Sequence, residues 1–596
     1  MIYVEPEPLD ENLPAELQRI ARKTLQKDAG KRYQTVKDLL IDLEDVREEL
    51  KLQNKLERTT WARREETKTQ ILNATTADAA HSTSSAEYIA TEIKRHKSAS
   101  IVALLVLLLA ISGLGYWFFA SRSANALQIE SIAVLPFVNE TGSADNEYLS
   151  DGMTESLIGG LSQLPKLSVK ARSSVFRYKG KEVSPQTAGK ELSVQAVLLG
   201  RVTQRGETLT LNLELVDAQT ENIIWSEQYN RKLNEIVTLQ SEVARDVSQK
   251  LRQRLTGTDE QRATKTYTQN PEAYELYLKG LYHWNKRTPD DLKQAIALFQ
   301  QAIDKDPAYA KAYAGLALTY AVLGGNMVFT REEGIETLLK AKAAARKALE
   351  LDNTLAEAYA VLGDVEGLEW DFAGAENDFK RAIELNPSNA TAHQWYSELL
   401  ARLGRNDEAL AEVKKAYELD PFSPAVSMNV ALRYLEARRY DEAIAQFKKV
   451  NQTDPAYPMA YLFLGGAYQE KGMYEEALEA QCKGDVLLKI DTPENCERKK
   501  AAIRQAIKKD GATGYWRKDL ERLLKEHEQG TASAVSIARV YARLGEKDRA
   551  FEWLEKAFAK RDPELSYLKI YESFDFGNIK SDPRFQDLLR RFGLPQ

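Results

Sequence analysis

The sequence has little cysteine and histidine, which limits its metal chemistry. Its 596 residues include 2 cysteines and 5 histidines. A structural zinc site usually takes four Cys or His ligands at short spacings, and no such group occurs here. We therefore predict neither a metal site nor a cofactor.

An excess of positive charge is also missing. The chain has 82 Lys and Arg residues against 88 Asp and Glu residues, a net charge of -6. Such a chain has no general attraction for the nucleic-acid backbone, so we expect no nucleic-acid partner. With 43% hydrophobic and 29% charged residues, the composition is that of folded domains, and the length suffices for about four of them.

One long uncharged apolar run interrupts this soluble composition. Residues 99–120 carry no charge, and as a helix they would extend about 33 Å, enough to cross a bilayer core of about 30 Å. Lys94, Arg95 and Lys97 precede the run, whereas Arg122 follows it. The positive-inside rule therefore predicts a single-pass protein of the inner (cytoplasmic) membrane, with a cytoplasmic N-terminus and extracytoplasmic C-terminal domains.

The segments before this run differ in character. Residues 51–98 contain a stretch rich in Ser and Thr with few large apolar residues, which predicts a juxtamembrane linker. Residues 1–50 contain two amphipathic helical patterns separated at Gly30.

The run from Lys27 to Gln34, followed by Leu39 to Leu43, resembles the end of the C-terminal lobe of bacterial serine/threonine protein kinases. In that family, the arginine that matches Arg32 pairs with a glutamate in the segment after the activation loop, so the resemblance gives Arg32 a structural role. The Gly-rich loop, the catalytic Lys, the His-Arg-Asp loop and the Asp-Phe-Gly motif are all missing from this chain. The resemblance thus implies a kinase remnant without catalytic activity; a helical extension unrelated to kinases is the alternative.

After the apolar run, residues 128–256 alternate between strand and helix patterns. An apolar strand at 131–137 precedes a helical pattern at 148–164, and a hairpin turn is predicted at 205–207. Such alternation predicts an α/β layer structure. The phrases at 132–137 and 147–155 resemble the TolB amino-terminal-like (FlgO-like) module of bacterial membrane signalling proteins, which implies an envelope-side interaction module.

Several charged residues of this region could be taken for a site. We interpret Asp151 and Glu155 as a helix cap and a first-turn carboxylate rather than an acid/base pair. A small basic group is interpreted as a solvated face; it consists of Arg172, Arg177, Lys179 and Lys181.

The second half of the chain has an internal period. Alanines 375, 409, 443 and 477 recur at one constant interval, and prolines 387, 421 and 455 share it. The period predicts an all-α superhelical solenoid. Its small, aromatic and Pro positions resemble the tetratricopeptide (TPR) pattern, with repeats over 265–490, a helical connector at 491–530, and a final TPR-like unit with a C-terminal cap at 531–596.

TPR arrays bind protein or peptide segments on a concave face lined by the first helix of each unit. The pattern places on that face Glu357, Asp364, Gln394, Glu398 and Arg402, followed by Met428, Leu432, Leu435, Met459, Leu462 and Gln469. The second group is mostly apolar, which favours an apolar or mixed peptide. Alternatively, these side chains pack against another unit or a neighbouring subunit of a homo-oligomer.

The two cysteines, Cys482 and Cys496, flank a turn signal at 491–494. Because this turn lies much nearer Cys496, two antiparallel helices would hold the sulfurs roughly 10 Å out of register. We therefore expect free thiols.

Together, these features predict a multidomain, membrane-anchored, non-catalytic TPR scaffold or sensor, the non-catalytic part of a receptor-type serine/threonine kinase. Two alternatives stay open: the chain is the regulatory part of an active kinase whose catalytic part lies elsewhere, or it is an envelope assembly scaffold.

Overall fold

The computed structural model describes residues 129–143, 146–164, 166–251, 264–324, 331–572 and 574–594. The predicted kinase remnant 1–50 with Arg32, the linker 51–98 and the predicted membrane span 99–120 lie outside these residues and stay predictions. Among the described helices, none is both long and apolar enough to cross a bilayer. The chain divides into two compact units, Met1–Ser121 and Arg122–Gln596, and the described residues belong to the second.

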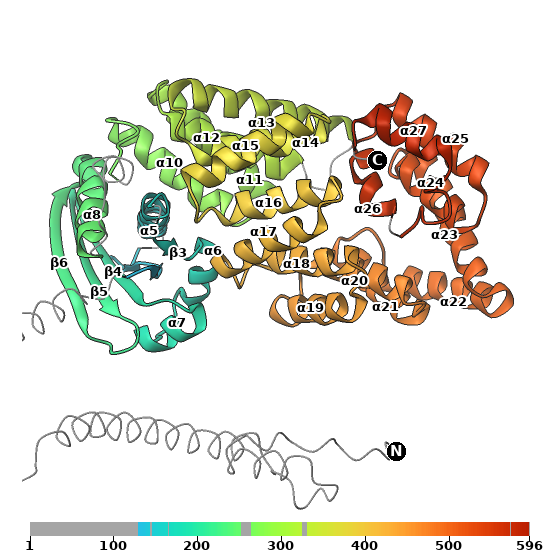
Figure 1. The fold of residues 1–596 in the computed structure, drawn as a ribbon. Helices are drawn as coiled ribbons and strands as arrows, with labels where there is room; N and C mark the ends of the chain where they lie inside the picture. Colours follow the sequence, from blue (N-terminus) through green and yellow to red (C-terminus); the bar gives the residue numbers. More distant parts are fainter. Residues whose placement is uncertain are drawn as a thin grey trace, which may run out of the picture. The chain divides into compact units, whose positions relative to one another are not determined.

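The α/β region is built on one mixed sheet (Figure 1). Its strands follow the order β3–β1–β4–β5–β6, with β2 also paired to β4. The pairs among β1, β2, β3 and β4 are parallel, whereas β4–β5 and β5–β6 are antiparallel. The strands are β1 (Ser131–Val134), β2 (Val138–Asn139), β3 (Ser168–Val169), β4 (Ala196–Arg205), β5 (Thr208–Asp217) and β6 (Ile223–Lys232).

Alternation of side chains explains the long strand β5. Leu209, Leu211, Leu213 and Leu215 are all fully buried, because successive odd positions face the same side of the sheet. The predicted hairpin turn is confirmed: Arg205 pairs with Thr208, and Gly206 takes a left-handed φ of 60° that favours glycine.

Two helices, α5 (Glu147–Leu161) and α8 (Ile236–Lys250), form the layer between this sheet and the repeats. Shorter helices are α6 (Arg172–Val175), η3 (Phe176–Tyr178), α7 (Pro185–Leu192) and η4 (Leu233–Glu235). Because α5 begins at Glu147, the interpretation of Asp151 as its cap is wrong; Asp151 is buried inside the helix and bonds Lys179 Nζ at 2.7 Å.

The helical region is a TPR array of paired helices in which small residues allow close packing. At Gly280, for example, an added Cβ would lie 2.6 Å from Phe299. The pairs are α10 (Pro271–Trp284) with α11 (Pro289–Lys305), α12 (Ala310–Gly324) with α13 (Arg331–Leu351), α14 (Ala356–Leu368) with α15 (Phe372–Leu385), α16 (Ala390–Arg402) with α17 (Asn406–Leu419), α18 (Pro424–Glu436) with α19 (Tyr440–Thr453), and α20 (Pro458–Glu470) with α21 (Tyr474–Leu487).

Further helices continue the array to its end. They are α22 (Pro493–Asp510), α23 (Ala512–Glu528), α24 (Ala534–Arg543), α25 (Lys547–Ala559), η5 (Pro563–Tyr567), α26 (Leu568–Glu572) and α27 (Pro583–Phe592). We refer to residues 563–594 as the C-terminal cap.

The α/β region docks on the array through a shared core. Helix α5 packs on α10, where an added Cβ at Gly152 would lie 2.8 Å from Leu278 Cδ2. The loop before α16 and the end of α17 contact the module as well: Asn386 Nδ2 donates to Ser162 Oγ at 3.0 Å, and Ala171 N donates to Leu419 O at 3.0 Å. One cluster of buried apolar side chains runs from the sheet into the repeats as far as Val365.

The C-terminal cap closes back on the middle of the array. The rings of Trp370 and Phe592 are 4.1 Å apart, and those of Phe372 and Phe592 are 5.9 Å apart. Buried side chains of α15–α17 and of the cap therefore share one hydrophobic cluster. Figure 1 shows α26 near the ends of α14 and α16, consistent with the contacts of α16 with α26 and of α14 with η5.

The expectation of free thiols is wrong in this structure. Cys482 and Cys496 form a disulfide with their Cα atoms 5.7 Å apart. Helix α21 ends at Leu487, earlier than the turn signal implied, so Cys482 lies near the end of α21 and Cys496 near the start of α22. Their axial offset is therefore only about 3 Å, which a disulfide can span.

Candidate peptide-binding surface

The first helices of successive units contact one another and form the inner layer of the array. These contacts join α12 to α14, α14 to α16, α16 to α18 and α18 to α20. Residues one repeat apart occupy equivalent positions on successive inner helices and form columns along this layer. Asp364 on α14 is thus equivalent to Glu398 on α16, and Arg402 on α16 is equivalent to Glu436 on α18. The periodicity therefore brings charged side chains of neighbouring units together.

Four of the predicted groove residues form a connected group. Gln394 Nε2 donates to Glu398 Oε1 at 3.3 Å, and Glu398 pairs with Arg402 at 3.9 Å. Burial raises the pKa of Asp364 to about 6, although Arg402 partly offsets this effect. The fifth predicted residue, Glu357, acts at longer range on the charge of Lys311 in α12.

Tyr567 of the C-terminal cap lies on this group. Arg402 Nη2 donates to Tyr567 OH at 3.0 Å, and the guanidinium carbon lies 4.7 Å from the centre of the tyrosine ring. The predicted surface on α14 and α16 is therefore partly covered by a segment of the chain itself. Sequence periodicity contained no signal for this contact, because Tyr567 lies outside the repeat pattern.

Three further residues belong to the group and were missed. Arg433 on α18 donates to Ser397 O at 3.0 Å and to Glu436 Oε1 at 2.7 Å. Glu436 could have been found, because it stands exactly one repeat after Arg402. Arg433 could not, since it stands one repeat after the buried Leu399 and so occupies a column of core residues.

We call this set the concave network: Asp364, Gln394, Ser397, Glu398, Arg402, Arg433, Glu436 and Tyr567. Four of its buried polar atoms have no hydrogen-bond partner among the described residues, namely Ser397 Oγ, Arg402 Nε, Arg433 Nε and Glu436 Oε2. Most buried polar atoms in proteins are hydrogen-bonded, so this concentration marks a place where a polar ligand or ordered water can bind. Burial also raises the pKa of Glu436 to about 7.

The mostly apolar group of predicted groove residues behaves differently. Met428, Leu432 and Leu435 are partly buried against the core of the α18–α21 repeats. Leu462 packs on α21, where an added Cβ at Gly484 would lie 2.6 Å from its Cδ2 atom. Met459 on α20 is also partly buried.

Gln469, the last predicted residue, hydrogen-bonds the hydroxyl of Tyr515 on α23. The apolar part of the predicted groove is therefore a partly buried strip on α18 and α20. At Gln469 this strip contacts the helical connector through Tyr515.

The charged residues of the α/β region serve its contact with the array. Arg172 Nε pairs with Glu155 at 3.3 Å, and Nδ2 of Asn285, the residue directly after α10, donates to the same carboxylate at 2.6 Å. The Arg177 guanidinium lies 3.8 Å from the Phe422 ring. The interpretation of this basic group as a solvated face is therefore wrong for Arg172, whereas Arg177 stays exposed although it lies over the Phe422 ring. Within the described residues, no group of three or more His, Cys, Asp or Glu side chains could hold a metal ion.

Comparisons with known proteins identify two kinds of region. A family model described as the HilA/YgeH-like transcriptional regulator, second domain, matches residues 128–246. Tetratricopeptide repeat models match residues 371–424 and 434–480, which supports the TPR assignment. Neither a kinase domain nor a TolB-like module is indicated, so the α/β region is similar to the HilA-type domain instead.

Among curated proteins, the chain is 32% identical over 232 residues to "Putative adenylate cyclase 3" of Rhizobium meliloti, covering 32% of this chain and 40% of that protein. It is 30% identical over 138 residues to "Transcriptional regulator HilA" of Salmonella typhimurium, covering 23% and 24%. The chain thus spans less than half the length of these relatives. Among solved structures, it is similar to YrrB, a TPR protein with an unusual peptide-binding site, at 25% identity, 32% and 91% coverage and a TM-score of 0.23.

Proposed function

We propose that this chain is a membrane-anchored, non-catalytic signalling scaffold whose TPR array binds a protein or peptide partner. The observation that carries the proposal is the concave network, whose unpaired buried donors and acceptors lie on the inner layer of the array. A polypeptide backbone offers both N–H and C=O groups, so it can satisfy Arg402 and Arg433 as well as Glu436.

The neighbouring apolar strip on α18 indicates which kind of side chain such a partner would have. Met428 and Leu432 lie on the same helix as Glu436 and are partly exposed. We therefore propose a partner peptide with both polar and apolar residues. Its backbone would hydrogen-bond to the concave network, and its apolar side chains would pack on this strip. Tyr567 would have to move or share the site, because it already bonds Arg402.

The relatives support a regulatory rather than a catalytic role for the matched region. One is named "Putative adenylate cyclase 3" and another "Transcriptional regulator HilA", so the two names assign different activities to proteins that share this similarity. By this proposal, the output of the present chain would be a serine/threonine kinase, of which residues 1–50 are a remnant. An envelope assembly scaffold is the alternative, and it would show no link to phosphorylation.

The disulfide supports an extracytoplasmic position of residues 121–596. Disulfides persist in oxidising compartments and are rare in the bacterial cytoplasm. If Cys482 and Cys496 are joined in cells, a thiol-reactive mass tag will add to the denatured chain only after reduction. Two free thiols in freshly denatured cells would contradict the proposed placement.

A photo-crosslinking experiment tests partner binding directly. A photoreactive residue replaces Leu432 on α18 in the full-length chain, and the control carries it at the exposed Lys415 on α17. We expect a discrete adduct of defined mass from position 432 that is absent from position 415. Identical adducts at both positions, or none at position 432, would reject the concave face as the binding surface.

A further inference from the structure

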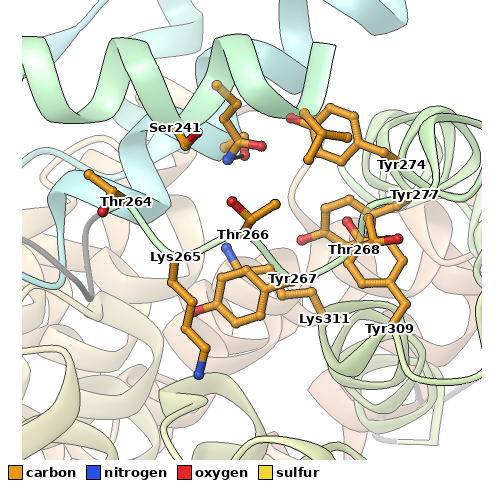
Figure 2. A pocket seen from close by; sticks show the side chains of 13 residues that line it. Ser241, Thr264, Lys265, Thr266, Tyr267, Thr268, Tyr274, Tyr277, Tyr309 and Lys311 are labelled. Carbon is orange, nitrogen blue, oxygen red and sulfur yellow. Dashed lines mark hydrogen bonds between the residues drawn. The ribbon is translucent and has the colours of Figure 1, made fainter. Parts of the chain in front are cut away.

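A second candidate site lies where the α/β region meets the first repeats. The pocket is a small cavity of about 20 Å³. Its wall combines Ser156 of α5, Gln240 of α8, the segment 264–268, and residues of α10 and α12. Figure 2 shows Tyr274, Tyr277, Tyr309 and Lys311 around the same space. The cavity admits a group of a few atoms at most.

Two lysines line this pocket, Lys265 and Lys311, and Lys311 is the one without an ion pair among the described residues. Its ammonium lies 4.4 Å from the centre of the Tyr267 ring, and no carboxylate of the described residues lies within ion-pair distance. The acidic groups Glu357, Asp352 and Glu155 act on it only at longer range, and Asp352 already pairs with Lys265 at 2.7 Å. Burial lowers the pKa of Lys311, because the charge is removed from water without a direct partner.

Two tyrosine hydroxyls of the pocket have no hydrogen-bond partner among the described residues. They belong to Tyr267 and to Tyr274, whose side chain is only 3% exposed. Ser156 and Gln163 lie near these hydroxyls but do not reach hydrogen-bonding geometry. Burial raises the pKa of both phenols, so each hydroxyl stays protonated and can donate a hydrogen bond.

We propose that this pocket binds an oxyanion group, a carboxylate or a phosphate, with Lys311 as its charge partner and the hydroxyls of Tyr267 and Tyr274 as donors. A partly buried cation without an ion pair and two hydroxyls without a hydrogen-bond partner can together bind an oxyanion, which would supply the negative charge and the acceptor atoms. Because the wall is shared by α5 and α8 on one side and by α10 and α12 on the other, the bound group would tie the module to the array. This proposal does not depend on peptide binding.

The test is calorimetric titration of the full-length chain in detergent with inorganic phosphate and, separately, with acetate, each against sodium chloride of equal ionic strength. The variants are Lys311→Met and Tyr274→Phe, and the control is Lys293→Met at an exposed lysine of α11. We expect saturable binding of one anion, and the anion that binds identifies the group. Lys311→Met should weaken binding at least about tenfold and Tyr274→Phe several-fold, with Lys293→Met unchanged.

Binding of neither anion at millimolar concentration would overturn the proposal. Equal affinity in the wild type and Tyr274→Phe would overturn it too. Tyr274→Phe keeps the packing of the ring, so this comparison remains decisive even if Lys311→Met does not fold.

Discussion

Some of the buried charged side chains lie on the inner helices of the array, among them Arg402, Arg433 and Glu436. Asp364 has Arg402 and Glu398 as its charged neighbours, and Arg402 also bonds Tyr567. A carboxyl in such a place is destabilised as an anion, because burial removes water and Glu398 adds like charge. Titration of the Asp364 carboxyl should therefore make the free energy of unfolding depend on pH.

The direction of this dependence follows from the pKa of Asp364, which rises from its ordinary value of 3.8 to about 6 in the folded chain. Between these values the unfolded chain releases a proton that the folded chain keeps, so this group lowers stability as the pH rises from about 4 to about 6. Asp364→Asn removes that slope. We expect its free energy of unfolding to gain about 1–3 kcal/mol over wild type between pH 4 and pH 7.

Urea denaturation at both pH values measures this difference, and Glu350→Gln on the exposed face of α13 serves as the control. A constant difference between Asp364→Asn and wild type across this range would show that the Asp364 carboxyl does not titrate there.

At the scale of elements, the contact between α5 and α10 depends on one glycine. An added Cβ at Gly152 would lie 2.8 Å from Leu278 Cδ2 and 2.9 Å from Leu278 Cβ, whereas Gly159 on the same helix has no heavy atom within 4 Å of that position. The two glycines therefore separate the effect of helix propensity from the effect of interhelical packing.

We expect Gly152→Ala to destabilise the chain by about 1–3 kcal/mol, because Leu278 must shift or the helices must separate. Gly159→Ala should instead stabilise it by about 0.5–1 kcal/mol, since alanine favours the helix. Denaturation midpoints of the two variants compare these effects. Equal midpoints would mean that α5 does not pack closely on α10.

At the largest scale, the described residues of unit 2 are held together by contacts between segments far apart in the sequence. The α/β region contacts the loop before α16 and the end of α17, and the C-terminal cap packs on Trp370 and Phe372. The α/β region and the C-terminal cap thus both pack on the middle repeats. The cap also contacts the surface on which a peptide is proposed to bind.

Removing one aromatic ring should open this closure. We expect Trp370→Ala to cost about 2–4 kcal/mol and to speed amide hydrogen exchange in the C-terminal cap, because Phe592 and Phe558 each lose one ring contact. Trp225→Ala in β6 removes a comparable ring from the sheet and should leave exchange in the cap unchanged. If the amides of the cap exchange as slowly in Trp370→Ala as in wild type, the cap is held by other contacts.

The sequence alone determined the helical array and its inner layer. A constant repeat interval gives each unit the same helix pair, because small residues must recur where helices approach. It placed Asp364, Gln394, Glu398 and Arg402 in one group. It also indicated the α/β layers and the hairpin turn at 205–207, since local alternation and glycine conformation decide both.

The tertiary structure decided everything that joins distant segments. Tyr567 on Arg402, Arg172 beside Glu155 and α10, and the disulfide between Cys482 and Cys496 all depend on where helices end and how they cross. A repeat period carries information about neighbouring units, but the contacts of a non-repeating cap or module are fixed only when the chain closes on itself. For that physical reason, neither the covered part of the groove nor the pocket around Lys311 could be read from spacing.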